Sequence, residues 1–181
     1  LTDVGTAIGS TPGTADKGVA ISVASDGDII AAGISDDDFA LIKLDATSGA
    51  LNSSFGTSGV VTTDIGNALG SASTTTDALN DIHVDGEAIY AAGSSGIAVS
   101  LAKYSESTGI LVPTFGINGI YYAQSSGSGG VAYSITMDSE DRLLIGGAAG
   151  GNLVAVRMDA STGTLETVFG SKLGGVVMVD V

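Results

Sequence analysis

A twelve-residue segment occurs three times in this chain of 181 residues, and each copy ends in Phe-Gly. The copies begin at Asp45, Ser105 and Asp159, so they are spaced by 60 and then 54 residues. Each copy also contains a Ser-Gly or Thr-Gly pair followed two positions later by leucine. A period of this length indicates a repeat architecture, in which each unit buries its apolar surface against its neighbours.

Local patterns inside one period predict β-strands. In the second unit, short apolar and β-branched runs cover residues 59–65, 78–84, 88–93 and 97–104. The turn dipeptide Asp85-Gly86 separates two of these runs, and residues 66–77 are rich in loop-forming Gly, Ser, Thr and Asn. No segment has a helical period. We therefore expect a single all-β repeat domain over residues 1–181, with units at approximately 5–65, 66–121 and 122–181.

Three four-stranded units predict a β-propeller-like array, and a closed β-trefoil is the alternative. A propeller has about 4–8 blades, so three blades fall short of a ring. Residues 1–5 are in phase with 62–66, and residues 176–181 are in phase with 60–65. One expectation is that two chains complete a six-bladed ring as a symmetric dimer. The other is that the units belong to a longer array or exchange strands with neighbours.

The charge balance narrows the classes of partner. Twenty acidic residues against six basic ones give a net charge of −14, which argues against binding to nucleic acid or to an anionic membrane surface. No apolar run approaches the ~18 residues of a membrane-inserted helix. Cysteine is absent, which excludes a disulfide framework and a thiolate metal site. This composition favours a secreted or cell-surface location.

The repeated motifs resemble the delta-60 repeat, a bacterial family. The resemblance rests on the Asp26-Gly27 turn before an apolar strand, on residues 38–44 (Asp-Phe-Ala-Leu-Ile-Lys-Leu), and on the recurring Phe-Gly and Gly-Val-Val elements. The second unit departs from it at residues 96–100, where Asp-Phe is missing, and the third has Ile-Gly-Gly in place of Ala-Ala-Gly. The resemblance implies β-propeller-like repeats in large surface proteins, and it implies no particular chemistry.

Two sets of residues recur in phase. The first comprises three aromatic residues and the glycines that follow them: Phe55, Phe115 and Phe169 with Gly56, Gly116 and Gly170. We expect each phenylalanine to fill the same pocket between adjacent sheets, and the alternative is a sugar-stacking aromatic in a carbohydrate-binding lectin. The second set comprises the cations Lys43, Lys103 and Arg157. Because a cation inside an apolar strand needs water or an acid, we expect these side chains to reach solvent or to pair with in-phase acids such as Asp26, Asp85 and Asp138. The alternative is a repeated contact to an anion or another ligand.

The densest carboxylate cluster is Asp36, Asp37 and Asp38. Calcium takes 6–8 oxygen ligands from carboxylates and loop carbonyls, so this cluster is a candidate calcium site, with a solvated turn as the alternative. Leu41 and Thr47 occupy the sixth and twelfth positions counted from Asp36, which excludes an EF-hand loop. No other cofactor is indicated.

No catalytic constellation is recognisable. His83 is the sole histidine, and no Gly-x-Ser-x-Gly elbow lies in a strand–turn–helix context. We therefore expect a non-catalytic structural or recognition module. Ligand contacts would lie in the variable loops at 5–18, 66–77 and 124–130. The alternatives are a lectin and a self-assembling filament or surface-layer subunit.

Overall fold

The computed structural model describes residues 16–70, 76–124, 129–170 and 174–180. They form an all-β structure of three four-stranded antiparallel sheets. Sheet A contains β1 (Lys17–Val23), β2 (Ile29–Ser35), β3 (Asp38–Leu44) and β4 (Val60–Thr63). Sheet B contains β5 (Asp77–Asp85), β6 (Ala88–Ser95), β7 (Ala98–Ser105) and β8 (Ile120–Gln124). Sheet C contains β9 (Gly130–Met137), β10 (Arg142–Ala149), β11 (Asn152–Asp159) and β12 (Val176–Val179).

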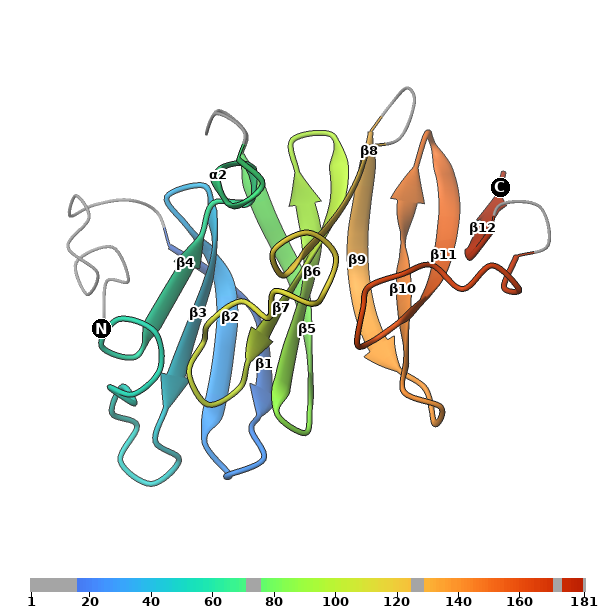
Figure 1. Ribbon diagram of the computed structural model, residues 1–181. Coiled ribbons are helices and arrows are strands. Elements are labelled where there is room, and N and C mark those ends of the chain that lie inside the picture. Colours follow the sequence, from blue (N-terminus) through green and yellow to red (C-terminus); the bar gives the residue numbers. More distant parts are fainter. Residues whose placement is uncertain (1–15, 71–75, 125–128, 171–173, 181) are drawn as a thin grey trace.

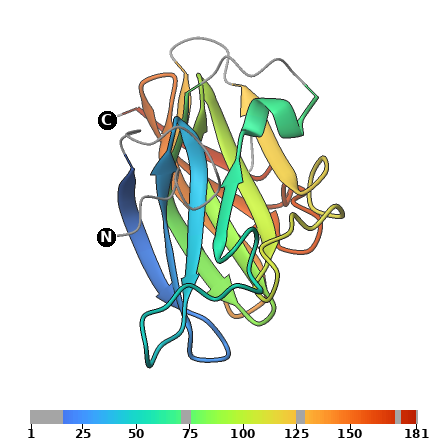
Figure 2. The same ribbon diagram turned by 90° about the vertical axis from the view of Figure 1, so that its left-hand side faces the viewer.

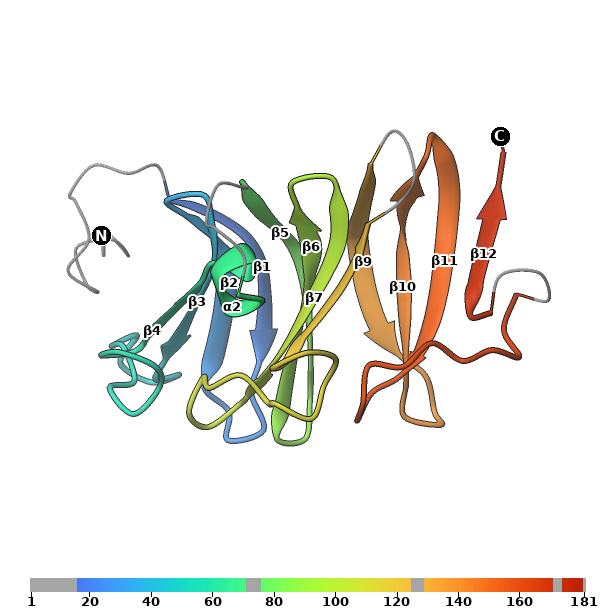
Figure 3. The same ribbon diagram turned by 45° about the horizontal axis from the view of Figure 1, so that its top comes forward.

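Within each sheet the strands pair in chain order, so every sheet is a meander. The last strand of one sheet leads into the first strand of the next. Figures 1 and 3 show sheet B standing between sheets A and C. Strand β5 packs against β1, β2 and β3, and β9 packs against β5, β6 and β7. We call the contact between sheets A and B the first junction, and that between sheets B and C the second junction.

The core follows the two junctions. One buried apolar cluster lies at the first junction and includes Phe39, Leu41, Ile65 and Tyr104. A second cluster lies at the second junction and includes Leu101, Ile145 and Met158. Alternate residues of sheet B serve the two clusters, because successive side chains of a strand point to opposite faces. Sheet B is therefore buried on both sides.

The clearest differences from the predicted boundaries lie at a short helix after β4 and at β8. The expected loop at 66–77 overlaps a one-turn helix, α2 (Ile65–Ala68), whose N-cap Asp64 accepts a hydrogen bond from the Asn67 backbone N–H. This cap ends the strand expected over 59–65, and β4 stops at Thr63. The boundary expected between residues 121 and 122 falls inside β8. Residues 1–15, 71–75 and 125–128, which include much of the three loops expected to carry ligand contacts, lie outside the described residues.

Candidate functional site

The recurring phenylalanines lie where neighbouring sheets meet. Phe55 and Phe115 are buried at the first and second junction respectively. A Cβ added at Gly109 would lie 3.1 Å from two ring atoms of Phe55, and one added at Gly163 would lie 3.1 Å from the ring of Phe115. Each ring thus packs beneath the Thr-Gly turn of the following unit, where a side chain larger than glycine does not fit.

A backbone hydrogen bond accompanies each of these ring contacts. The Gly56 N–H donates to the Thr108 carbonyl at 2.8 Å, and the Gly116 N–H donates to the Thr162 carbonyl at 2.8 Å. The third phenylalanine, Phe169, is half-buried, and the described residues form no sheet beyond its own. Its ring lies 4.8 Å from the guanidinium carbon of Arg157 in its own unit.

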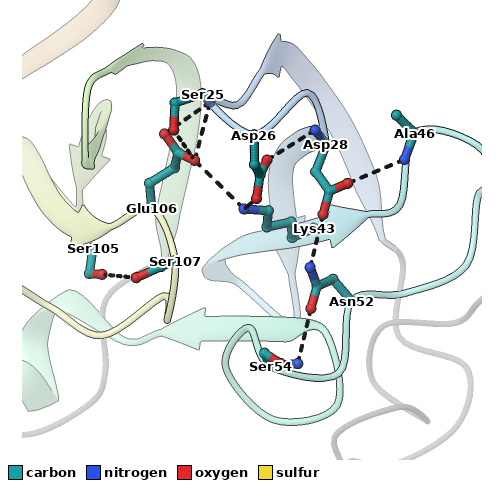
Figure 4. Close-up of polar contacts among 10 residues, drawn as sticks. All are labelled: Ser25, Asp26, Asp28, Lys43, Ala46, Asn52, Ser54, Ser105, Glu106 and Ser107. Atoms are coloured by element: carbon teal, nitrogen blue, oxygen red, sulfur yellow. Dashed lines mark hydrogen bonds and ion pairs between the residues drawn. The ribbon is translucent and has the colours of Figure 1, made fainter.

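Lys43 connects sheets A and B through a charged network (Figure 4). The buried Lys43 ammonium lies 2.7 Å from Asp26 and 3.6 Å from Glu106. Glu106 is also buried and accepts hydrogen bonds from the backbone N–H and the hydroxyl of Ser25 at 3.0–3.2 Å. The hydrogen bond from Lys43 holds the pKa of Asp26 below its ordinary value. The predicted partnership between Lys43 and Asp26 is therefore present.

The other two cations have partners that the sequence did not indicate. Lys103 donates to the Ala160 carbonyl of sheet C at 2.8 Å and lies 5.0 Å from the centre of the Tyr90 ring. Burial lowers the pKa of Lys103, and the charge of Asp159 opposes that shift. Arg157 lies 2.8 Å from Glu166 within its own unit. Lys43 and Lys103 thus reach across a junction to the next unit, whereas Arg157 does not.

Lys103 and Arg157 do not pair with Asp85 and Asp138, and the positions of the neighbouring residues explain why. Asp138 lies 2.7 Å from Arg142, four residues further along the same hairpin. Lys103 points toward sheet C, where the position corresponding to Glu106 is occupied by Ala160, so that only the main-chain carbonyl is available.

The predicted acidic cluster is rearranged by the fold. Asp36 and Asp37 are exposed and form the β2–β3 turn, with φ of 54° and 65°. Asp38 instead joins Asp64 and Asp77, and one carboxylate oxygen of each lies within 4.8 Å of the others. Asp77 is buried and accepts a hydrogen bond from the Ile65 N–H at 2.6 Å. This triad, rather than residues 36–38, is where the described residues place three carboxylates together.

Burial raises the pKa of Asp38 to about 6, and the neighbouring charges of Asp64 and Asp77 add to the shift. Crowded carboxylates attract either a proton or a hard cation such as Ca²⁺, which takes only oxygen ligands. Asp77 and Asp64 also accept backbone hydrogen bonds, from the N–H groups of Ile65 and Asn67 respectively.

An apolar cleft lies at the second junction. It has a volume of about 280 Å³ and opens between β7–β8 and β10–β12. Its walls include Val99, Leu101, Val154 and Met158. The strand registers show which residues are equivalent at the two junctions. Val99 corresponds to Phe39 of the first junction, and Met158 corresponds to Tyr104. The larger rings fill the space that the second junction leaves open.

No family model matches the chain, and the search of curated proteins found no match. Among the residues that the structure describes, no helix is long and apolar enough to cross a membrane.

Sequence reasoning did not single out Glu106, Asp64 or Asp77. Glu106 reads as an exposed turn residue, and its burial results from the approach of Ser25 in the neighbouring sheet. Asp64 does carry a local signal, since an aspartate before Ile-Gly-Asn fits a helix N-cap. No local signal marks Asp77, which reaches the triad because β5 begins beside the β2–β3 turn, where its N–H donates to the Asp37 carbonyl.

Proposed function

We propose that this chain is a non-catalytic structural or recognition module that acts outside the cell, and that its three sheets are consecutive propeller-type blades. The topology supports this reading, because each sheet is a meander and the first strands β1, β5 and β9 lie next to one another. The acidic composition agrees with an extracellular location. The delta-60 resemblance agrees with the same proposal.

The observation that carries the proposal is how the recurring residues are used. Phe55 and Phe115 are buried between sheets, and Lys43 and Lys103 bind the following unit. In-phase residues that serve junctions are what a structural array requires. The lectin alternative needs an accessible aromatic in each unit for a sugar to stack on, and two of the three rings are fully enclosed.

Truncation of one ring tests the proposal. We expect Phe115→Ala to lower the free energy of unfolding by about 3–5 kcal/mol, since it removes a fully buried ring. The control is Ile117→Ala, two residues away at an exposed position, which should change stability by less than about 0.5 kcal/mol. Urea unfolding measures both. Unchanged stability of Phe115→Ala together with loss of binding on a glycan array would refute the structural role in favour of the lectin.

A second candidate function is that of a self-assembling subunit. It is favoured by exposed apolar side chains on the outer faces of the two end sheets, including Ile21 and Val23 on sheet A and Leu153 and Val179 on sheet C. Exposed apolar patches of this kind mark interaction surfaces.

A further inference from the structure

The outer face of sheet A repeats a surface that is covered elsewhere in the molecule. We call this outer face of sheet A the front face. In Figure 2 the molecule is seen from the side on which sheet A lies. Ile21 pairs with Ala31, as Ile82 pairs with Ala91 in sheet B and Ile135 with Ile145 in sheet C. Ile82 and Ile135 pack against the preceding sheet and are 7% and 4% exposed, whereas Ile21 is 72% exposed. The front face therefore has the apolar pattern of a junction without a preceding sheet.

The outer face of sheet C, here called the back face, is the complementary case. Leu153 pairs with Ala148, in the register that pairs Phe39 with Ile34 in sheet A. Phe39 packs against the following sheet and is 0% exposed, but Leu153 is 61% exposed. The neighbouring Ala155 and Val179 are exposed as well. This face has the pattern of a junction without a following sheet.

At each junction a phenylalanine ring packs beneath a glycine turn of the following unit, and the front and back faces each carry one half of this contact. Gly49 lies where Gly109 and Gly163 lie in the other units, and an added Cβ there would meet nothing within 4 Å. At the other end, Phe169 is half-buried and has no Thr-Gly turn over its ring among the described residues. The chain thus presents the turn of one junction on its front face and the ring of another on its back face.

From these observations we propose that a second copy of this chain covers both faces, the back face of each copy docking on the front face of the other. The inference rests on the proposed reading of the sheets as consecutive blades. The docked contact would continue a junction that the molecule already forms twice, with Phe169 beneath Gly49 of the other copy. Two copies supply six sheets, within the range of about 4–8 that closed propellers use, whereas three copies would exceed it. The assembly is a closed dimer.

Light scattering coupled to size exclusion measures the first consequence. The chain has a mass of 17.7 kDa, and we expect a single species of about 35 kDa over the accessible range of concentration. A monomer throughout that range would overturn the proposal and leave these faces to a different partner. An open series of higher oligomers would also overturn it, because head-to-tail contacts that do not close form filaments.

Two variants test which faces meet. Ile21→Glu places a carboxylate on the front face and Leu153→Glu places one on the back face, and each should shift the species to the monomer mass. A carboxylate buried without a partner should raise the dissociation constant by about 100-fold or more. Ile110→Glu is the matched control, since Ile110 is 67% exposed in a turn of the second unit, and it should remain dimeric.

Mixing the two variants gives the sharpest test. A pair formed from one Ile21→Glu chain and one Leu153→Glu chain retains one intact contact, between the unaltered back face of the first and the unaltered front face of the second. We expect the mixture to recover a heterodimer that neither variant forms alone. Failure to recover it would overturn the head-to-tail arrangement. Circular dichroism separates the two proposals. A parent protein that is monomeric but has a β-dominated spectrum contradicts only the docking, whereas a spectrum dominated by helix contradicts the proposed blades as well.

Discussion

The two junctions have the same backbone plan and different contents. At the first junction the rings of Phe39 and Tyr104 and the helix residue Ile65 form a filled core, and the Tyr104 hydroxyl donates to Thr63 at 3.0 Å. At the second junction Val99 and Met158 replace the two rings, and a cleft of about 280 Å³ remains. The repeat thus specifies how sheets meet, while single side chains decide how tightly.

The lysines of the two junctions also differ in how well their charges are compensated. Lys43 at the first junction pairs with two carboxylates, one of which is buried. Lys103 at the second junction instead contacts the Ala160 carbonyl and the ring of Tyr90. Burial favours a charged group only where an opposite charge compensates for lost hydration. The equivalent cations should therefore contribute differently to stability.

The largest expected effect separates these two lysines. Lys43→Met should lower the free energy of unfolding by about 3 kcal/mol or more, because it leaves the buried Glu106 carboxylate without its cation. Lys103→Met should change it by less than about 1 kcal/mol, since the substitution removes a poorly compensated charge along with one hydrogen bond. Urea unfolding of both variants measures the difference. Equal losses would contradict the contrast between the junctions.

The junction glycines should form a graded series. Gly49, Gly109 and Gly163 share a positive φ of 68–71°, so alanine costs each about 1–2 kcal/mol of backbone strain. At Gly109 the new Cβ would also overlap the Val61 side chain at 2.4 Å, whereas at Gly163 its shortest contact would be 3.1 Å, to the Phe115 ring. Overpacking adds about 1–3 kcal/mol. We expect unfolding free energies to fall most for Gly109→Ala, less for Gly163→Ala and least for Gly49→Ala.

Measurement of this series requires dissociated protein. Thermal unfolding in the Leu153→Glu background keeps Gly49 uncovered. A Gly49→Ala loss as large as that of Gly109→Ala would show that the ring contact contributes nothing beyond φ.

The acidic triad should oppose folding at neutral pH. The pKa of Asp38 is raised to about 6 from 3.8, so the folded state binds the proton more tightly. The protonated Asp38 carboxyl is compatible with folding, so the stability linked to its proton is fully present below about pH 4. That stability is lost as the pH rises through about 6 and the buried carboxyl ionises. Asp38→Asn should remove this dependence and, after allowance for solvent screening, raise stability at pH 8 by about 1 kcal/mol. Melting temperatures of both proteins between pH 4 and pH 8 give the difference curve.

Calcium distinguishes a proton site from a cation site in the same triad. If the triad binds Ca²⁺, the melting temperature of the parent protein rises in calcium relative to chelator, and Asp38→Asn abolishes the rise. Asp37→Asn serves as the matched control, because Asp37 lies outside the triad. An identical melting temperature in calcium and chelator would end the calcium hypothesis.

A similarly small effect is expected at the cleft. Val99→Phe introduces at the second junction the side chain that Phe39 provides at the first, and it should raise stability by about 1 kcal/mol by burying the ring in the cleft. Val168→Phe, at a position that is 84% exposed, should leave stability unchanged. A loss of stability in Val99→Phe would mean that the two walls cannot accommodate the ring.

Local patterns predicted most of the strand framework. The Asp85-Gly86 turn separates β5 from β6, and the expected runs at 78–84, 88–93 and 97–104 correspond to β5, β6 and β7. These features depend on residues adjacent in the chain, where alternation and turn chemistry are decisive. The one-turn helix α2 was missed because a single cap residue, Asp64, ends β4 and begins the helix.

Most contacts of the candidate site join residues that are far apart in the sequence and that no local pattern brings together. The pairing of Lys43 with Asp26 was expected and is present, but the same reasoning gave the wrong partners for Lys103 and Arg157. The approach of Glu106 to Ser25 spans 81 residues, and the meeting of Asp38 with Asp77 joins two sheets. Neither pair is periodic, because the corresponding positions in the other units carry different residues.

The amino-acid sequence by itself determined that this protein repeats a four-stranded β unit three times, since strand alternation, turns and the Phe-Gly period are properties of neighbouring residues. The tertiary structure alone decided which recurring positions are covered. Ile82 and Ile21 are the same residue at the same register, yet one is buried and the other exposed, because burial depends on whether another sheet stands in front. The presence of that sheet is a property of the stack, which no single unit encodes.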